Sequence, residues 1–222
     1  MGANMSWDRA LAAAIDHTVL GADASDRDIE LACDEAILYG FSSLVVHPFY
    51  LPTIVDRLHG TSVSPCSVVS FPFGAHMPLV KREEARRLIG AGAVEIDAVM
   101  NIAAFRSGHR EFIEEEAKGL ASVCQGAAVF KLIIETAYLD DRQIADAAQL
   151  AMEFGADFVK TSTGFASRGV TVRDIEVIKS VVGDRMGIKA SGGIKTQPFA
   201  RELLDAGATR LGCSSSLGVI GA

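Results

Sequence analysis

The sequence predicts a (β/α)8 barrel, in which eight parallel strands alternate with helices and close into a cylinder. Short apolar runs alternate with segments of helical periodicity along the 222 residues, and glycines recur where the helices should end. We expect residues 1–222 to form a single domain with eight strands. The last helix should be short or missing, because Ala222 follows soon after the eighth strand near Leu211.

The expected strands are short runs rich in Val, Ile and Phe, which is typical of strands buried on both faces of a parallel sheet. The first strand should lie near Ile15 and the last near Leu211. The runs between them are Ser43–His47, Ser67–Phe71, Val94–Met100, Val129–Ile134, Asp157–Lys160 and Met186–Ala190.

Helices are expected between these strands, because apolar residues there repeat with the helical period. Two such faces are Ile29, Ala32, Cys33, Ala36 and Ile37, and Ile144, Ala147, Ala148 and Ala151. Two capping boxes predict helix starts, one at Ser25 with Asp28 and one at Thr171 with Asp174. The acidic segment 111–118 should form a solvated helix face.

Four helices should end in the same turn, a glycine followed by a new apolar run. These glycines are Gly40, Gly92, Gly155 and Gly207. Glycine adopts the left-handed conformation at low cost, which suits the turn from a helix into the next strand. The rival fold, a doubly wound open sheet, would need a G-x-G-x-x-G turn after its first strand, and the sequence after Ile15 has none.

The bulk composition limits the possible partners. The net charge of −7 argues against nucleic acid, which requires clustered Lys and Arg. No run is long enough to span a membrane, and the segment Met1–Arg9 lacks a signal peptide pattern. The four cysteines should be reduced, as is typical of a cytoplasmic protein, and the five histidines form no metal-binding pattern.

Several charged residues lie within the expected strands, where a barrel should be apolar. They are Asp16, Asp97, Lys131, Glu135, Lys160 and Lys189. Each could be a structural ion pair or a lysine whose stem alone is buried. A cluster of them on one face favours chemistry, because buried ion pairs are weak evidence for stability.

Two neighbouring lysines predict amine chemistry. A free lysine has a pKa near 10.4, so only about one in a few thousand is neutral at pH 7. Burial and a second cation both lower the pKa of the amine, and a neutral amine forms a Schiff base with a carbonyl compound. With carboxylates to move protons, this pattern predicts a class I aldolase that needs no metal or other cofactor.

Small residues after the last three strands predict a phosphate site. They occur in the segments 160–164 (KTSTG), 191–193 (SGG) and 212–216 (GCSSS). Backbone N–H groups in such loops and at helix N-termini bind phosphate, and barrels often place this site after strands seven and eight.

These stretches resemble the deoxyribose-phosphate aldolase family. The matching segments are IDHTVL from Ile15, SFPFG from Ser70, GAVEIDAVMN from Gly92, KLIIET from Lys131, GADFVKTSTGF from Gly155, GIKASGGIKT from Gly187 and AGATRLGCSSS from Ala206. The resemblance implies reversible cleavage of 2-deoxy-D-ribose 5-phosphate into acetaldehyde and D-glyceraldehyde 3-phosphate, in deoxyribonucleoside breakdown. It also implies a dimer or tetramer.

The resemblance implies a role for each matching residue. Lys160 is the expected Schiff-base lysine, Lys189 its pKa-lowering neighbour, Asp97 the proton-relay carboxylate and Asp16 a supporting carboxylate. The expected substrate and phosphate contacts are Thr18, Lys131, Thr163, Gly164, Gly192, Gly193, Gly212, Ser214 and Ser215.

The sequence departs from the family pattern at a few positions. Phe165 replaces a lysine found in some members, so phosphate binding should depend on backbone groups, serines and Lys195. Two other functions remain open: a barrel enzyme for a different sugar phosphate, and a sugar-phosphate sensor that has lost the chemistry. A sensor should have lost one of the candidate catalytic lysines or aspartates. Lys160, Lys189, Asp16 and Asp97 are all present.

Overall fold

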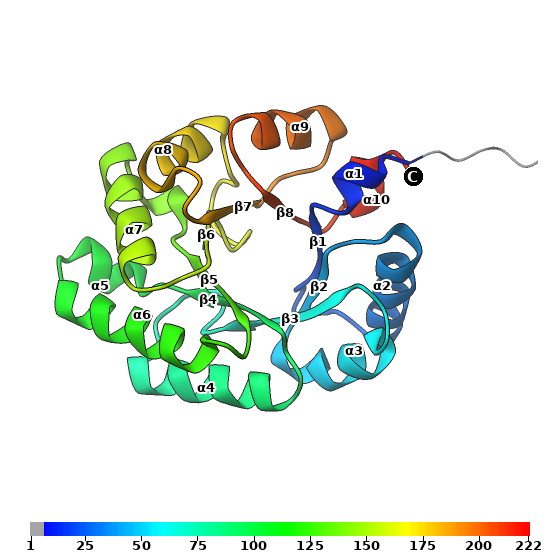
Figure 1. Ribbon diagram of the computed structural model, residues 1–222, viewed down its shortest axis with the longest axis horizontal. Coiled ribbons are helices and arrows are strands. Elements are labelled where there is room, and N and C mark those ends of the chain that lie inside the picture. Colours follow the sequence, from blue (N-terminus) through cyan, green and yellow to red (C-terminus); the bar gives the residue numbers. More distant parts are fainter. Residues whose placement is uncertain (1–6) are drawn as a thin grey trace, which may run out of the picture.

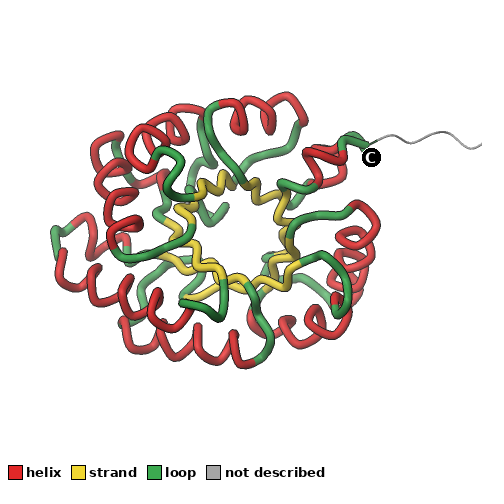
Figure 2. Tube along the Cα trace, in the orientation of Figure 1, coloured by secondary structure: helices red, strands yellow, loops and turns green. Residues whose placement is uncertain are grey.

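The computed structural model describes residues 7–222 and shows a closed barrel of parallel strands inside a ring of helices (Figures 1 and 2). Each strand pairs with the next in chain order, and the last pairs with the first. The strands are β1 Ile15–Val19, β2 Ser43–Val46, β3 Ser64–Val69, β4 Glu95–Val99, β5 Val129–Ile133, β6 Phe158–Lys160, β7 Gly187–Ser191 and β8 Arg210–Cys213. The predicted fold class is confirmed. Residues 1–6, part of the segment without a signal peptide pattern, lie outside the described residues.

Helices follow the strands along the chain and surround the barrel (Figure 1). The α-helices are α1 Arg9–Ala12, α2 Asp26–Tyr39, α3 Leu51–Leu58, α4 Pro78–Gly90, α5 Ile102–Arg106, α6 Arg110–Cys124, α7 Asp141–Glu153, α8 Val172–Val182, α9 Gln197–Asp205 and α10 Ser216–Ile220. Two short 3-10 helices, η1 Pro48–Tyr50 and η2 Thr136–Tyr138, follow β2 and β5. None of the helices described is long and apolar enough to cross a membrane.

The predicted helix ends are confirmed. Gly40 has φ of 69° and ends α2 in the left-handed conformation, and Gly92, Gly155 and Gly207 also have positive φ. Both predicted capping boxes form. A third one, Asp140 with Gln143 at α7, was not predicted, although its D-x-x-Q spacing carries the same signal.

One strand boundary and one helix residue differ from the prediction. The strand expected at Ser67–Phe71 begins at Ser64 and ends at Val69, because Ser70 takes a positive φ of 54° that leaves the extended conformation. Ile37, placed on the buried face of α2, is 42% exposed; the α2 residues that pack inward are Ile29, Ala32, Cys33 and Ala36.

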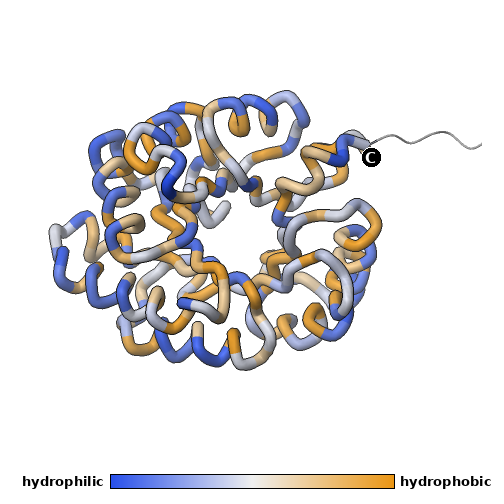
Figure 3. Tube along the Cα trace, viewed as in Figure 1, coloured by the Kyte–Doolittle hydropathy of each residue, from blue (hydrophilic) through white to orange (hydrophobic). Residues whose placement is uncertain are grey.

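The apolar core lies mainly between the barrel and the helices. Along each helix, hydrophobic and hydrophilic stretches alternate (Figure 3), as expected for a helix with one buried face. Inside the barrel, the Phe158 ring occupies space next to Gly187, where a Cβ would lie 2.3 Å from a ring carbon. All four cysteines are buried and free.

The acidic segment 111–118 differs from the prediction at one position. Glu116 is 1% exposed and forms a buried ion pair with Lys81 of α4, with 2.5 Å between Nζ and Oε2. Lys81 also donates to the Val99 carbonyl, and Glu116 accepts from the Asn101 N–H. Instead of facing solvent, Glu116 therefore links α4 and α6 to the end of β4.

The predicted short last helix is confirmed. It is α10, which spans only Ser216–Ile220. The short N-terminal helix α1 lies beside it between α9 and α2 (Figure 1), and the Asp8 N–H donates to the Ile220 carbonyl at 3.1 Å. Two short helices from opposite ends of the chain together complete the ring.

Candidate active site

Strand register brings the predicted lysines together. Lys160 at the end of β6 is the direct partner of Lys189 on β7, and Asp97 on β4 is the direct partner of Lys131 on β5. All four side chains are buried. Because side chains alternate between the two faces of a strand, these residues can meet only inside the barrel.

One carboxylate oxygen joins the two lysines. The Asp97 Oδ2 atom lies 2.8 Å from Lys160 Nζ and 2.7 Å from Lys189 Nζ. Its other oxygen, Oδ1, lies 2.9 Å from Lys131 Nζ. The structure thus places Asp97 at the centre of the predicted group, within proton-transfer distance of both amines.

The surroundings shift the pKa values of the two lysines in opposite directions. Burial lowers the pKa of Lys160, and the Lys189 cation adds to this while Asp97 opposes it. Burial also acts against the charged form of Lys189, but the carboxylates of Asp16 and Asp97 outweigh it and raise its pKa. Of the two lysines, Lys160 is therefore the one whose pKa is shifted toward the neutral form.

Asp16 is completely buried. It forms ion pairs with Lys189 and with Arg210, whose Nη1 lies 2.6 Å from Asp16 Oδ1. Burial raises the pKa of Asp16, but Lys189, Lys131 and Arg210 outweigh it, so that the pKa falls below its ordinary value. Asp16 thus holds Lys189 in place rather than facing the cavity.

A cavity of about 350 Å³ opens above Lys160 at the C-terminal ends of the strands. Lys160 is the only one of the predicted catalytic residues that lines it. The predicted contacts that line it are Thr18, Thr163, Gly164, Gly192, Gly193, Gly212 and Ser214. Lys131 and Ser215, also predicted as contacts, are not among the lining residues: Lys131 is fully buried beside Asp97, and Ser215 precedes α10.

Glycines bring two loops close together at this cavity. The Val170 N–H donates to the Gly192 carbonyl, and a Cβ on Gly169 would lie 2.1 Å from that carbonyl oxygen. Gly164, Gly192 and Gly193 all have positive φ. The loops after β6 and β7 can therefore present backbone N–H groups to an anion. Gly169 was missed, because its partner Gly192 is distant in sequence.

Gly212 has a packing role that the sequence did not reveal. A Cβ at this position would lie 2.9 Å from the Ser191 Cβ and 3.2 Å from the Lys189 Cε. The absence of a side chain leaves room for the Lys189 stem. Gly212 therefore lines the cavity and also leaves space for the side chain of Lys189.

Other predicted residues are held by bonds within the protein. The Thr163 N–H and hydroxyl both donate to Glu135 Oε2, and the Thr18 hydroxyl donates to the Asp16 carbonyl at 2.9 Å. Glu135 has φ of 53°, an unusual conformation for a residue with a side chain. Through its two bonds with Thr163, Glu135 holds the loop after β6 in place.

An apolar wall was missed by the sequence prediction. Leu20 and Phe165 line the cavity, and Phe165 contacts the edge of Phe71, with ring centroids 5.4 Å apart. Phe71 lies next to His47 in turn. These residues come from the ends of β1, β2, β3 and β6, so no local sequence pattern could show that they meet.

His17 and Ser216 form another contact that the sequence prediction missed. His17 Nδ1 lies 2.8 Å from Ser216 Oγ, and its Nε2 lies 3.2 Å from Glu35 Oε2. Burial lowers the pKa of His17 to about 4, so the ring is neutral near pH 7. This contact anchors the start of α10, two residues after Ser214 of the cavity.

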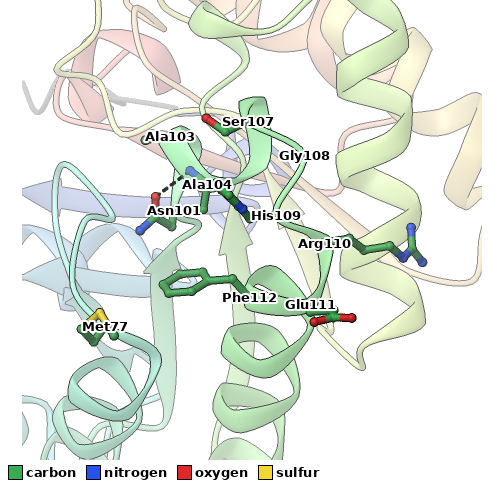
Figure 4. A pocket seen from close by; sticks show the side chains of 10 residues that line it. All are labelled: Met77, Asn101, Ala103, Ala104, Ser107, Gly108, His109, Arg110, Glu111 and Phe112. Carbon is green, nitrogen blue, oxygen red and sulfur yellow. Dashed lines mark hydrogen bonds between the residues drawn. The ribbon is translucent and has the colours of Figure 1, made fainter.

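A larger groove of about 920 Å³ lies elsewhere, between α4, α5 and α6. Figure 4 shows its lining, which includes Met77, Asn101, His109 and Phe112. It contains none of the buried lysines or aspartates of the barrel. We therefore take the smaller cavity as the candidate site, because it is lined by Lys160. Residues 7–222 hold no cluster of three His, Cys, Asp or Glu side chains suited to a metal ion.

A parallel barrel with a buried amine at the base of a glycine-lined cavity defines an enzyme class that includes aldolases. The family model for DeoC/LacD family aldolases matches residues 10–220, so the chain belongs to this family. A deoxyribose-phosphate aldolase of Acholeplasma laidlawii is 48% identical over 93% of this chain and 92% of its own.

Solved structures agree with this family. A structure of a putative deoxyribose-phosphate aldolase from Coccidioides immitis has a TM-score of 0.93 at 32% identity, covering 96% of this chain and 85% of that one. A deoxyribose phosphate aldolase from Aeropyrum pernix, described as a unique tetramer, has a TM-score of 0.88 at 33% identity. It covers 96% of this chain and 90% of that one.

Proposed function

We propose that this protein is a deoxyribose-phosphate aldolase that works through a Schiff base on Lys160. The substrate is 2-deoxy-D-ribose 5-phosphate, and the products are acetaldehyde and D-glyceraldehyde 3-phosphate. The observation that carries the proposal is the Asp97 oxygen shared by Lys160 and Lys189 at the base of the cavity. Full-length relatives that bear this name support the choice of substrate.

The reaction uses the neutral Lys160 amine as a nucleophile. The amine attacks the aldehyde carbon of the open-chain sugar, and loss of water gives an iminium ion. A base removes the proton of the C3 hydroxyl, the C2–C3 bond breaks, and its electron pair passes to the iminium to give an enamine. Glyceraldehyde 3-phosphate leaves at this point. Protonation of the enamine and hydrolysis then release acetaldehyde and the free amine.

Asp97 is the proposed proton carrier for these steps. Its Oδ2 contacts both amines, and the neighbouring cations hold its pKa far below the ordinary value despite burial. It therefore remains a carboxylate that can accept a proton only transiently. Lys189, held charged by Asp16 and Asp97, is the proposed proton donor.

The glycine loops are the proposed phosphate site. Gly164, Gly192, Gly193 and Ser214 line the cavity together with Lys195, which supplies a cation. The apolar wall of Leu20 and Phe165 would then contact the carbon chain of the sugar.

The proposal is tested by an assay of acetaldehyde release from 2-deoxy-D-ribose 5-phosphate. Lys160→Ala should lose activity by at least about 10⁴-fold, because the covalent step has no substitute nucleophile. The surface variant Lys179→Ala is the matched control and should keep full activity. Near-normal turnover by Lys160→Ala would refute the role of Lys160, whereas binding of sugar phosphate without turnover in the unmodified protein would favour a sensor.

We further propose a homo-oligomer, either a dimer or a tetramer. The tetrameric aldolase from Aeropyrum pernix supports self-association. We also propose that the protein acts in the cytoplasm, which a phosphorylated substrate of deoxyribonucleoside breakdown would support. Light scattering after size-exclusion chromatography measures the mass directly, and a value near the 23.5 kDa of one chain would contradict the oligomer.

A further inference from the structure

The charged residues inside the barrel extend well beyond Lys160, Lys189 and Asp97. Strands β1, β4, β5, β6, β7 and β8 all contribute to one group, which we call the barrel cluster. Its members are Asp16, Glu95, Asp97, Lys131, Lys160, Lys189 and Arg210. The sequence prediction did not include Glu95 or Arg210.

The barrel cluster is one continuous network of ion pairs. Lys131 Nζ lies 2.5 Å from Glu95 Oε2 and 2.9 Å from Asp97 Oδ1. Arg210 Nη1 lies 2.6 Å from Asp16 Oδ1 and 3.3 Å from Glu95 Oε1. Each member is therefore linked to Lys160 through no more than a few contacts.

The charges of the barrel cluster do not balance when every member is ionised. Three carboxylates, Asp16, Glu95 and Asp97, face four cations. An unbalanced charge in a buried site is costly, because the surroundings solvate it poorly. The cluster is neutral when one of the four cations loses its proton.

Lys160 is the cation best placed to lose its proton. It contacts a single carboxylate, whereas Lys131 contacts three, and Lys189 and Arg210 contact two each. Arginine does not lose its proton in proteins. The direction of the pKa shifts agrees, since Lys160 is lowered while Lys131 and Lys189 are raised.

We propose that the charge balance of the whole barrel cluster, and not Lys189 alone, keeps the Lys160 amine neutral. Glu95, Lys131 and Arg210 are positioning residues in this account, because they act through Lys160 and do not touch the substrate. The inference rests on the proposed role of Lys160 as the Schiff-base residue, and it assigns Lys131 to charge balance instead of substrate contact.

The other groups near the cluster carry no charge or are engaged elsewhere. Strand β2 contributes the neutral Ser43, and β3 contributes Cys66, whose thiol pKa is raised by burial. Burial likewise raises the pKa of Cys213 on β8 to about 12. Glu135, beyond the end of β5, accepts from Thr163 and forms no ion pair with the four cations of the cluster.

The test changes the charge count in both directions. Glu95→Gln removes a negative charge and should lower the pKa of Lys160, whereas Lys131→Met removes a positive charge and should raise it. Each shift should be about one pH unit, because Lys131 is linked to Lys160 through Asp97, and Glu95 through Lys131 and Asp97, inside a buried network. The double variant Glu95→Gln/Lys131→Met restores the count, so its Lys160 pKa should return close to the starting value.

The pKa is measured by competitive acetylation of Lys160 across pH, read by peptide mass spectrometry on the full chain. Glu116→Gln is the matched control, because it removes an equally buried carboxylate outside the barrel and should leave the Lys160 midpoint in place. If Lys131→Met does not fold, the near-isosteric Glu95→Gln and the Glu116→Gln control still show whether loss of a carboxylate in the cluster lowers the pKa of Lys160.

Shifts in the same direction for both single variants, or a double variant that remains shifted, would overturn the charge-balance account. An equal shift in Glu135→Gln and Glu95→Gln would overturn it as well, by adding a fourth carboxylate to the count. Acetylation measures the amine without substrate. A failure of Lys160 to form an imine would therefore refute the proposed function. The acetylation midpoints would still show whether the charge of the cluster sets the pKa of Lys160.

Discussion

At the scale of single residues, the neighbours of Lys160 decide its chemistry. A lysine attacks a carbonyl only when neutral, so activity rises as pH rises through its pKa. Burial and Lys189 lower that pKa, which moves the rise toward neutral pH. A variant that removes a cation beside Lys160 should therefore move this rise to higher pH, and one that removes a carboxylate should move it to lower pH.

Lys189→Leu should move the pH–activity profile to higher pH. Removing this cation leaves Asp97 to stabilise the charged form of Lys160, so the Lys160 pKa should rise by about one unit or more. The measurement is kcat/KM across pH, with Lys179→Leu as a surface control that should not shift. An unchanged profile would count against the two-lysine account.

Gly212→Ala should impair both stability and turnover. Its Cβ would crowd Ser191 and the Lys189 stem, and overpacking of this kind costs about 1–3 kcal/mol. Thermal unfolding and kcat measure the two effects. Gly218→Ala is the matched control, because its Cβ would have no atom nearer than 3.8 Å. A Gly212→Ala protein as stable and active as the control would show that the space is not needed.

At the scale of elements, the short helix α10 depends on a contact with β1. His17 and Ser216 tie its first turn to the barrel, and α1 lies beside it. Because Ser214 of the cavity lies two residues before Ser216, the contact also fixes one side of the proposed phosphate site.

Ser216→Ala should weaken binding of phosphorylated substrate in particular. Loss of the hydroxyl leaves the Nδ1 atom of the buried His17 without a partner, at a cost of about 1–3 kcal/mol in stability, and loosens the Ser214 loop. We expect KM for 2-deoxy-D-ribose 5-phosphate to rise several-fold, with little change in kcat/KM for unphosphorylated 2-deoxyribose. Equal losses with both sugars would indicate only general destabilisation.

The sequence predicted these elements well where the signal was local. Apolar runs, glycine turns and two capping boxes placed strands and helices to within a few residues, and the alternation of side chains put Asp97, Lys160 and Lys189 on the inner face. Ser70 and Ile37 were misjudged, because neither the positive φ of Ser70 nor the exposure of Ile37 follows from the local apolar pattern. Glu116 was misjudged for the same reason, since only the fold brings Lys81 to it.

At the scale of the whole molecule, barrel closure makes the site. It brings β1 beside β8, so that Arg210 and Asp16, at opposite ends of the chain, form an ion pair. Such a contact leaves no trace in local periodicity, which is why Glu95 and Arg210 were missed while the lysines were found. The assignment of residues 1–222 to one domain stays a prediction.

The central claim, that Lys160 forms the Schiff base, is tested most directly by borohydride trapping with 2-deoxy-D-ribose 5-phosphate or acetaldehyde, followed by peptide mass spectrometry. We predict a reduced adduct on Lys160 and none on Lys189, whose pKa is raised by Asp16 and Asp97. An adduct on another lysine, or no adduct in the folded protein, would contradict the claim.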